Sequence, residues 1–170
     1  MRIGVRPISL RLSRRVAELH NRLCRARYFR GHGVHSPFVY DIVRRVFMCE
    51  ELLPGDRTLY EALCAAGISR CRAMQLQNLA IHCGYTTFGL NRADMELCVV
   101  MPDLPRIDTL ALVRAAAEAG HTVVVMSPYN GRVRQALCRQ IVSEHCSTTV
   151  DNRGYLLIFN NHLPKQHFRI

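Results

Sequence analysis

Two short apolar runs with a helical pattern between them constrain the fold of this chain more than any other feature. MELCVVM (95–101) and HTVVVMS (121–127) are rich in apolar and β-branched residues, which is typical of strands buried on both faces. The intervening IDTLALVRAAAEA (107–119) predicts a helix that ends at Gly120. A buried strand, a helix and a second buried strand indicate an α/β domain.

The residues that follow continue the same pattern. Residues 131–145 predict a helix, and STTVDNRGYLLIF (147–159) predicts a strand, a turn and a second strand. The buried side of that helix is expected to carry Val133, Leu137, Ile141 and Val142. From residue 95 onward the predicted order is therefore β-α-β-α-β-β.

The first 92 residues are expected to form a basic helical region that packs with the sheet of residues 93–170 as one compact unit. Helical patterns cover residues 8–28, Pro37 to about Cys49, 58–66 and 69–82. Ser36 is a favourable N-cap, and Pro37 suits the first helical position. Phe38, Ile42 and Val46, with Val39 and Val43 beside them, are expected to face inward.

Positive charge is concentrated at the beginning of the chain. Residues 1–45 carry eleven of the 23 basic residues but two of the 13 acidic ones. The anion or nucleic-acid candidates are Arg11, Arg14, Arg15, Arg22, Arg25 and Arg30. Most lie away from the leucine stripe of the helix predicted over 8–28, so a solvated face is the alternative interpretation. Few aromatic residues accompany these arginines, which argues against stacking on single-stranded nucleic acid.

The cysteines and the N-terminus indicate a cytoplasmic protein. None of the eight cysteines forms a CxxC pair, so we expect reduced, mostly buried thiols and no metal site. The first residues lack the continuous apolar core of a secretory signal. No run approaches the length of a membrane span, so we expect no membrane-spanning segment.

The stretch GHGVHSPFVYDIV (31–43) allows three interpretations. Its glycines and Ser36-Pro37 are suited to ending one helix and starting the next. Alternatively, the N-terminus of the new helix forms an anion site with Arg30 nearby. In the third interpretation, His35 acts as a catalytic base.

Two motifs resemble a known family when they are taken together. HGVHSPFVYDIV (32–43) and GYLLIFNNHLPKQHF (154–168) resemble a group of class I S-adenosylmethionine-dependent methyltransferase-like proteins typical of Bacteroidetes bacteria. In that group an HGxHSPFVxD helix precedes a Rossmann-like domain that ends in KQHF. The resemblance covers about residues 28–60 and 95–170, and it implies S-adenosylmethionine as the cofactor.

The cofactor site implied by this resemblance has little room in the sequence. Such a fold has a glycine-rich turn after its first strand. The candidate relic is IHCGYTTFG (81–89), with Gly84, Thr86 and Gly89 as cofactor-binding candidates. The next predicted strand begins at Met95, whereas one βαβ unit needs about 30 residues. The simplest interpretation is an internal deletion, so that strands four to seven survive and the Rossmann-like sheet is truncated.

We therefore expect a degenerate methyltransferase-like protein that does not bind S-adenosylmethionine, is not an enzyme, and acts as a binding or scaffold protein. Asp103, between two prolines, is the acidic candidate for a catalytic role, and a turn residue is the alternative. One alternative function is an active methyltransferase whose site is rebuilt or completed by a partner. Another is a nucleic-acid-associated module that uses the Arg-rich helix.

The truncation also raises the question of what covers the strand edge that it leaves. An exposed apolar edge at Met95–Met101 would favour pairing with another chain. We therefore expect either coverage of this edge by residues 80–92 or a contact with another protein, such as a homodimer.

Overall fold

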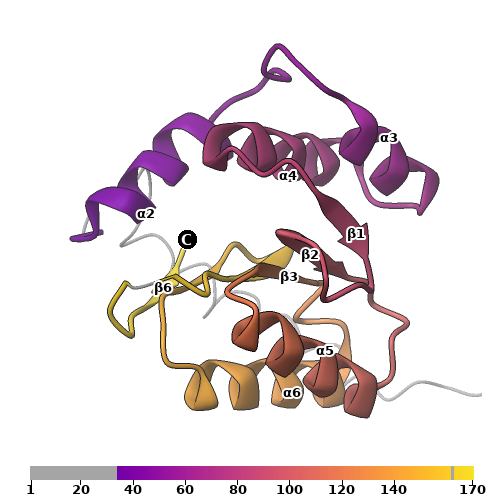
Figure 1. Cartoon of the computed structure of the whole chain (residues 1–170), viewed down its shortest axis with the longest axis vertical. Helices are drawn as coiled ribbons and strands as arrows, with labels where there is room; N and C mark the ends of the chain where they lie inside the picture. The colour runs from indigo at the N-terminus through magenta and orange to yellow at the C-terminus, as the bar shows by residue number, and fades with distance from the viewer. Residues whose placement is uncertain (1–33, 162) are drawn as a thin grey trace, which may run out of the picture.

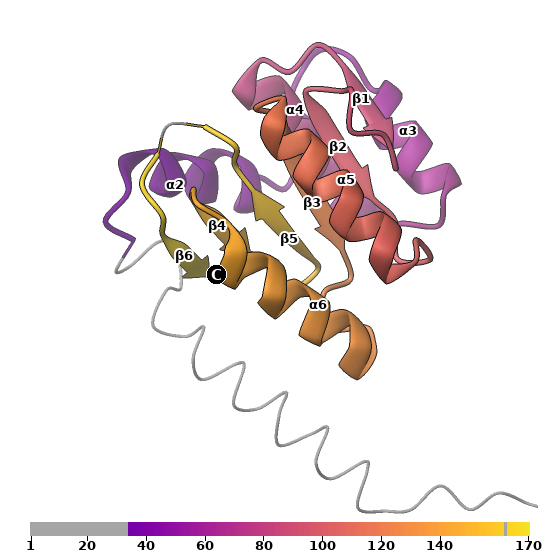
Figure 2. The same cartoon turned by 60° about the horizontal axis from the view of Figure 1, so that its bottom comes forward.

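The two apolar runs predicted as buried strands lie next to each other in the sheet. In the computed structural model, which describes residues 34–161 and 163–170, they form β2 (Leu97–Val100) and β3 (Thr122–Met126), paired in parallel. Every residue of both strands is buried, because helices cover both faces of the sheet (Figures 1 and 2). The predicted α/β class is confirmed.

The sheet has six strands in the order β1-β2-β3-β5-β4-β6. The remaining strands are β1 (Phe88–Leu90), β4 (Thr149–Asp151), β5 (Tyr155–Ile158) and β6 (His167–Arg169). β4 and β5 form the predicted hairpin. β5 runs antiparallel to both of its neighbours, and all other neighbouring strands are parallel. The last residues of β1, β2, β3, β4 and β6 therefore lie at one edge of the sheet, which we call the carboxyl edge.

Helices form a layer on each face of the sheet (Figures 1 and 2). One layer contains α2 (Pro37–Ile42), its π-helical continuation η2 (Val43–Phe47), α3 (Thr58–Ala65) and α4 (Arg70–Cys83). The other contains α5 (Arg106–Glu118) and α6 (Gly131–Glu144), which connect successive strands. These helices agree with those predicted for the described residues. The helix predicted over 8–28, with its candidates from Arg11 to Arg30, lies outside the described residues.

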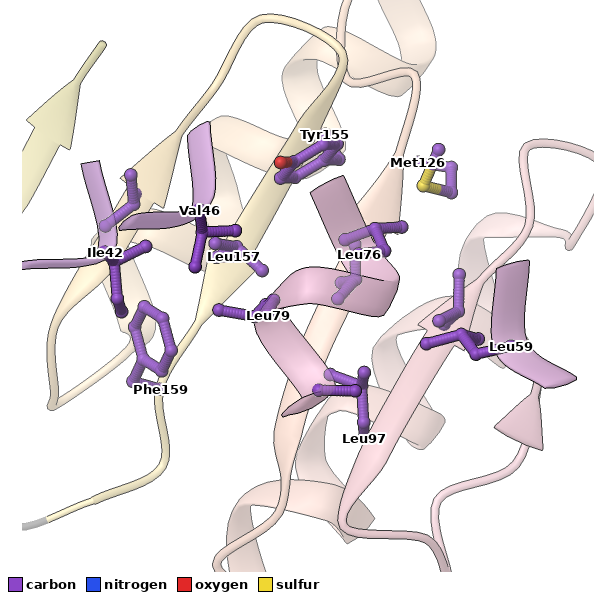
Figure 3. Packing of buried hydrophobic residues seen from close by; sticks show 14 of the residues in the cluster. Ile42, Val46, Leu59, Leu76, Leu79, Leu97, Met126, Tyr155, Leu157 and Phe159 are labelled. Carbon is purple, nitrogen blue, oxygen red and sulfur yellow. The ribbon is translucent and has the colours of Figure 1, made fainter. Parts of the chain in front are cut away.

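The first helical layer and the sheet share one apolar core. Leu76 and Leu79 of α4 lie between the sheet and the preceding helices, close to Leu97 and Leu157 (Figure 3). The prediction that Ile42, Val46, Val39 and Val43 face inward is confirmed, since all four are buried. Burial of this continuous surface is what holds the described helices of the N-terminal region against the sheet.

The sheet begins earlier than the sequence suggested. β1 lies inside the region expected to be helical, and its residues pair with β2 from Phe88 opposite Leu97 to Leu90 opposite Val99. Coverage of the Met95–Met101 edge by residues 80–92 is therefore confirmed. The alternative, a homodimer or another protein across that edge, loses its basis, because both edges of β2 are paired within the chain.

The buried side of α6 differs from the prediction at one position. Leu137 and Ile141 are buried as expected, but Val133 is 72% exposed and Arg134 is 7% exposed. Neighbouring helical residues point about 100° apart, so the two cannot share the centre of one face. The prediction for Val133 was wrong because the buried stripe of α6 starts with an arginine whose partners lie on other elements.

Candidate functional site

The carboxyl edge is the first place to look for a site, because ligands in α/β sheets bind outside the carboxyl ends of the strands. β2 is followed by a turn that contains Asp103, and then by α5. Asp103 is exposed in this turn. Burial lowers the pKa of Arg134, and the negative charge of Asp103 partly offsets this effect. Asp103 is thus a turn residue at the carboxyl edge whose charge acts on an arginine of α6.

Arg134 closes the carboxyl edge between β2 and β3. Its Nη2 donates to the carbonyl oxygens of Met101 and Met126, each at 3.1 Å, and its Nη1 lies 3.4 Å from Thr109 Oγ1. Burial lowers the pKa of this guanidinium. The carbonyl groups that end β2 and β3 are thus satisfied by a cation of the chain itself, in the way that buried polar groups require.

A second buried polar group lies on the α4 side of the carboxyl edge. The Tyr155 hydroxyl donates to Gln75 Oε1 at 3.2 Å and accepts from Asn152 Nδ2 at 2.9 Å. Arg72 Nη1 donates to the same Gln75 oxygen at 2.8 Å, and its guanidinium lies 5.6 Å from the centre of the Tyr155 ring. Burial raises the pKa of Tyr155, so the hydroxyl keeps its proton. These groups hold α4 to the β4–β5 hairpin.

The three cofactor-binding candidates each have a place in the local structure. Gly84 ends α4 in the left-handed conformation, with φ of 71°. The Thr86 N–H and hydroxyl both donate to Glu96 Oε2, at 2.7 and 2.8 Å. A Cβ on Gly89 would lie 2.9 Å from Arg92 Cβ and 2.9 Å from Met95 Cγ, so the chain itself covers this glycine.

The stretch around His35 starts a helix in the way that the first interpretation predicts. Ser36 is the N-cap of α2, with its hydroxyl 3.4 Å from Val39 N, and Pro37 is the first helical residue. His35 is exposed immediately before this cap. The glycines of the motif and Arg30 lie outside the described residues. Ser36 and Pro37 therefore start α2, and the anion site and the catalytic role of His35 remain hypotheses.

The KQHF tail has two sides, because strand residues alternate between the faces of a sheet. Phe168 is buried in the core beneath the first helical layer. His167 and Arg169 therefore project toward the α6 side, where both are exposed. His167 Nδ1 lies 2.8 Å from Thr149 Oγ1 on the neighbouring strand.

These side chains line a pocket between α6 and the last strands, which we call the α6 pocket. Its volume is about 380 Å³. It is lined by Pro128, Tyr129, Gln135, Cys138, Arg139, Val142, Ser143, Asp151, Leu156, His167 and Arg169. Tyr129, Asp151 and Arg169 place one end of it at the carboxyl edge, since they follow or end β3, β4 and β6. Ser143 and His167 extend it toward the opposite edge of the sheet. This pocket lies beside the antiparallel strand, away from the edge that Arg134 closes.

Two internal contacts shape the α6 pocket. The Tyr129 hydroxyl donates to the Asp151 carboxylate, which also accepts from Arg153 N at 2.9 Å. Burial raises the pKa of Cys138 to about 11, so this thiol is protonated and a poor nucleophile at neutral pH. The polar side chains of the α6 pocket can therefore act by hydrogen bonds and charge, whereas nucleophilic attack by Cys138 is disfavoured.

A second hollow, of about 480 Å³, lies between the C-terminal ends of α5 and α6. Several of its polar groups are engaged with one another: Arg114 lies 3.7 Å from Glu144, and the Ser147 hydroxyl lies 2.9 Å from the carbonyl oxygen of Asn161. His145 Nε2 is buried there without a hydrogen-bond partner among the described residues. This hollow lies away from the carboxyl edge, so the α6 pocket is the better candidate for a ligand site.

Neither a metal centre nor a membrane span is found in residues 34–161 and 163–170. No group of three or more His, Cys, Asp or Glu side chains there is arranged to hold a metal ion. None of the helices there combines the length and the apolarity that crossing a bilayer requires. The seven cysteines of this part are free thiols.

Comparison of the chain with family models, with curated proteins and with solved structures finds no match.

Sequence reasoning missed Arg134 and the α6 pocket. Arg134 could have been found from its spacing, because it lies three residues before Leu137 and seven before Ile141, on one helical face. Thr149 and Asp151 are two positions apart in a predicted strand, so the sequence indicates that both polar side chains project from the same face of the sheet. No pattern in the sequence predicts that Arg169 lies near α6, because β6 pairs with β4 across a long loop.

Proposed function

We propose that this chain is a binding protein built on a methyltransferase-like α/β sheet that does not bind S-adenosylmethionine and does not transfer methyl groups. The observation that carries this proposal is the connection between β1 and β2. It consists of the six residues 91–96, from the end of β1 at Leu90 to the start of β2 at Leu97. Parallel neighbours usually need a crossover of about a dozen residues or more.

The short connection is held tightly against the strands. Asn91 N donates to the Val99 carbonyl at 2.8 Å, and Asn91 Oδ1 accepts from Met101 N at 2.8 Å. Arg92 and Asp94 form an ion pair at 2.7 Å. A dinucleotide-type cofactor site needs a glycine turn that opens a helix at this point of the chain. Here the chain returns directly to the next strand.

The backbone donors near the candidate relic are also occupied. Glu96 Oε2 accepts from the backbone N–H groups of Thr86 and Thr87, at 2.7 and 3.0 Å. These contacts hold the pKa of Glu96 below its usual value. Backbone N–H groups of this kind bind anions in other proteins. In this chain, a carboxylate of the return loop takes that position.

The strand order also supports the proposal that the chain keeps a methyltransferase-like sheet without its cofactor half. β5, formed after β4 in the sequence, lies antiparallel between β3 and β4. In the proposed assignment, β2, β3, β4 and β5 correspond to strands four to seven of a methyltransferase-like sheet.

Calorimetric titration with S-adenosylmethionine, repeated with S-adenosylhomocysteine, tests this proposal. We expect no heat of binding from a sample whose folding is verified by circular dichroism. Micromolar binding of either ligand would overturn the proposal and favour an active methyltransferase with a rebuilt or partner-completed site. Thr86→Val and Gly89→Ala would then show whether the candidate relic contributes to that site.

A further inference from the structure

We infer that the α6 pocket binds a small phosphate-bearing molecule with a polar carbon skeleton, such as a sugar phosphate. The inference specifies a ligand for the proposed binding protein, but it rests on contacts that are independent of S-adenosylmethionine. The pocket volume of about 380 Å³ is within the range of small-molecule sites, which is about 300–1,000 Å³.

Two guanidinium groups from different elements give this pocket its charge. Arg139 projects from α6 and Arg169 from β6, and both residues are exposed. Neither guanidinium has a hydrogen bond or an ion pair with any residue that the structure describes. Some other exposed arginines are paired, such as Arg45 with Asp41 at 2.8 Å and Arg92 with Asp94. Exposed arginines without a partner among the described residues also occur elsewhere, such as Arg132, but only Arg139 and Arg169 are in the described lining of this pocket. Arg139 and Arg169 are therefore available to an anion.

The charge and geometry of two arginines suit a phosphate monoester. Guanidinium groups donate pairs of parallel hydrogen bonds to phosphate oxygens, and two of them match the charge of a dianion. Asp151 is the one carboxylate among the described lining residues, and its oxygens accept from the Tyr129 hydroxyl and from Arg153 N. With two arginines and one aspartate, the lining keeps a net positive charge.

The rest of the lining suits a carbon skeleton with hydroxyl groups. Pro128, Val142 and Leu156 supply apolar surface, and the amide of Gln135 is half-buried among them. An amide can both donate to and accept from a hydroxyl group. A sugar phosphate would use both the arginines and this wall, whereas inorganic phosphate would use the arginines alone.

Calorimetric titration of the full chain with ribose 5-phosphate tests the inference, with inorganic phosphate, ribose and acetate as comparison ligands. We expect ribose 5-phosphate to bind more tightly than inorganic phosphate, and ribose and acetate to bind more weakly than either. Arg139→Gln and Arg169→Gln should each weaken binding about tenfold, because each removes charge-assisted hydrogen bonds. Arg132→Gln is the matched control, since Arg132 is exposed on the same helix and outside the lining.

Several results would overturn the inference. Absence of ribose 5-phosphate binding at millimolar concentration would do so, as would binding that Arg139→Gln and Arg169→Gln weaken no more than Arg132→Gln does. Equal binding of acetate would exclude recognition of a dianion. Equal binding of inorganic phosphate would exclude a role for the apolar wall. Binding of S-adenosylmethionine that is unchanged in Arg139→Gln would contradict the proposed function and leave this inference intact.

Discussion

Arg134 and Arg139 belong to the same helix but lie in opposite environments. Arg134 is buried, and its guanidinium donates to the carbonyl groups that end β2 and β3. Arg139 is exposed at the α6 pocket, beside β4 and β6. Arg134 closes the carboxyl edge between β2 and β3, whereas Arg139 contributes an exposed positive charge to the α6 pocket.

The difference shows how structural and recognition roles can be separated for one residue type. A buried cation needs hydrogen bonds from the protein. Nη1 and Nη2 of Arg134 have acceptors, whereas its buried Nε has no partner among the described residues. An exposed guanidinium is hydrated at little cost, and it exchanges water for an oxyanion when a ligand arrives. The contrast predicts that Arg134 governs stability and Arg139 governs binding.

The largest expected effect is that of Arg134→Ala. This substitution removes the side-chain donor to the carbonyl groups of Met101 and Met126, of which Met101 keeps the Leu104 N–H at 3.3 Å, and it opens a cavity. We therefore expect a loss of about 3 kcal/mol in the free energy of unfolding. Urea denaturation measures it. Arg139→Ala is the matched control and should change stability by less than about 0.5 kcal/mol. Equal losses in the two variants would refute the assigned roles.

Gly89→Ala should have the next largest effect, because the added Cβ meets Arg92 and Met95 in the loop that follows β1. We expect a loss of about 2 kcal/mol, as for other overpacked sites. Thermal denaturation measures it, and Met95→Ala in the same chain should recover part of the loss. An unchanged melting temperature would mean that the loop does not pack on this glycine.

Tyr155→Phe tests the hydrogen bonds by which the Tyr155 hydroxyl connects α4 to the β4–β5 hairpin. Removal of the hydroxyl leaves Gln75 and Asn152 with one partner fewer, so we expect a loss of about 1.5 kcal/mol. Tyr40→Phe is the control, because Tyr40 is 46% exposed. If chemical denaturation gives similar values for both variants, the buried hydroxyl contributes nothing to this connection.

The smallest expected effect concerns Glu96 and is visible only in acid. Its folded-state pKa lies below the usual value of 4.5, so its stabilising contribution is present at neutral pH. The contribution should decline as the pH falls below 4.5 and be lost as the pH passes through the folded-state pKa. The stability difference between the native chain and Glu96→Gln should therefore shrink in that window. A difference that stays constant would show that Glu96 is not held by Thr86 and Thr87.

Local patterns in the sequence were enough to predict most of the described elements. The helices over 58–66 and 69–82 and the hairpin within 147–159 follow from periodicity and from turn residues. β1 was not predicted because three residues are too few for a periodic signal. It is a strand because β2 offers it an edge.

The sequence alone determines the α/β class, because apolar runs of strand length that alternate with helical patterns can be buried in few other ways. It also determines the start of α2, since Ser36 and Pro37 act on adjacent backbone groups. The tertiary structure decides what closes and what opens the carboxyl edge. Arg134 finds acceptors on two strands, and Arg139 and Arg169 meet at one pocket from separate elements. Such partners are distant in sequence, and chain folding alone brings them together.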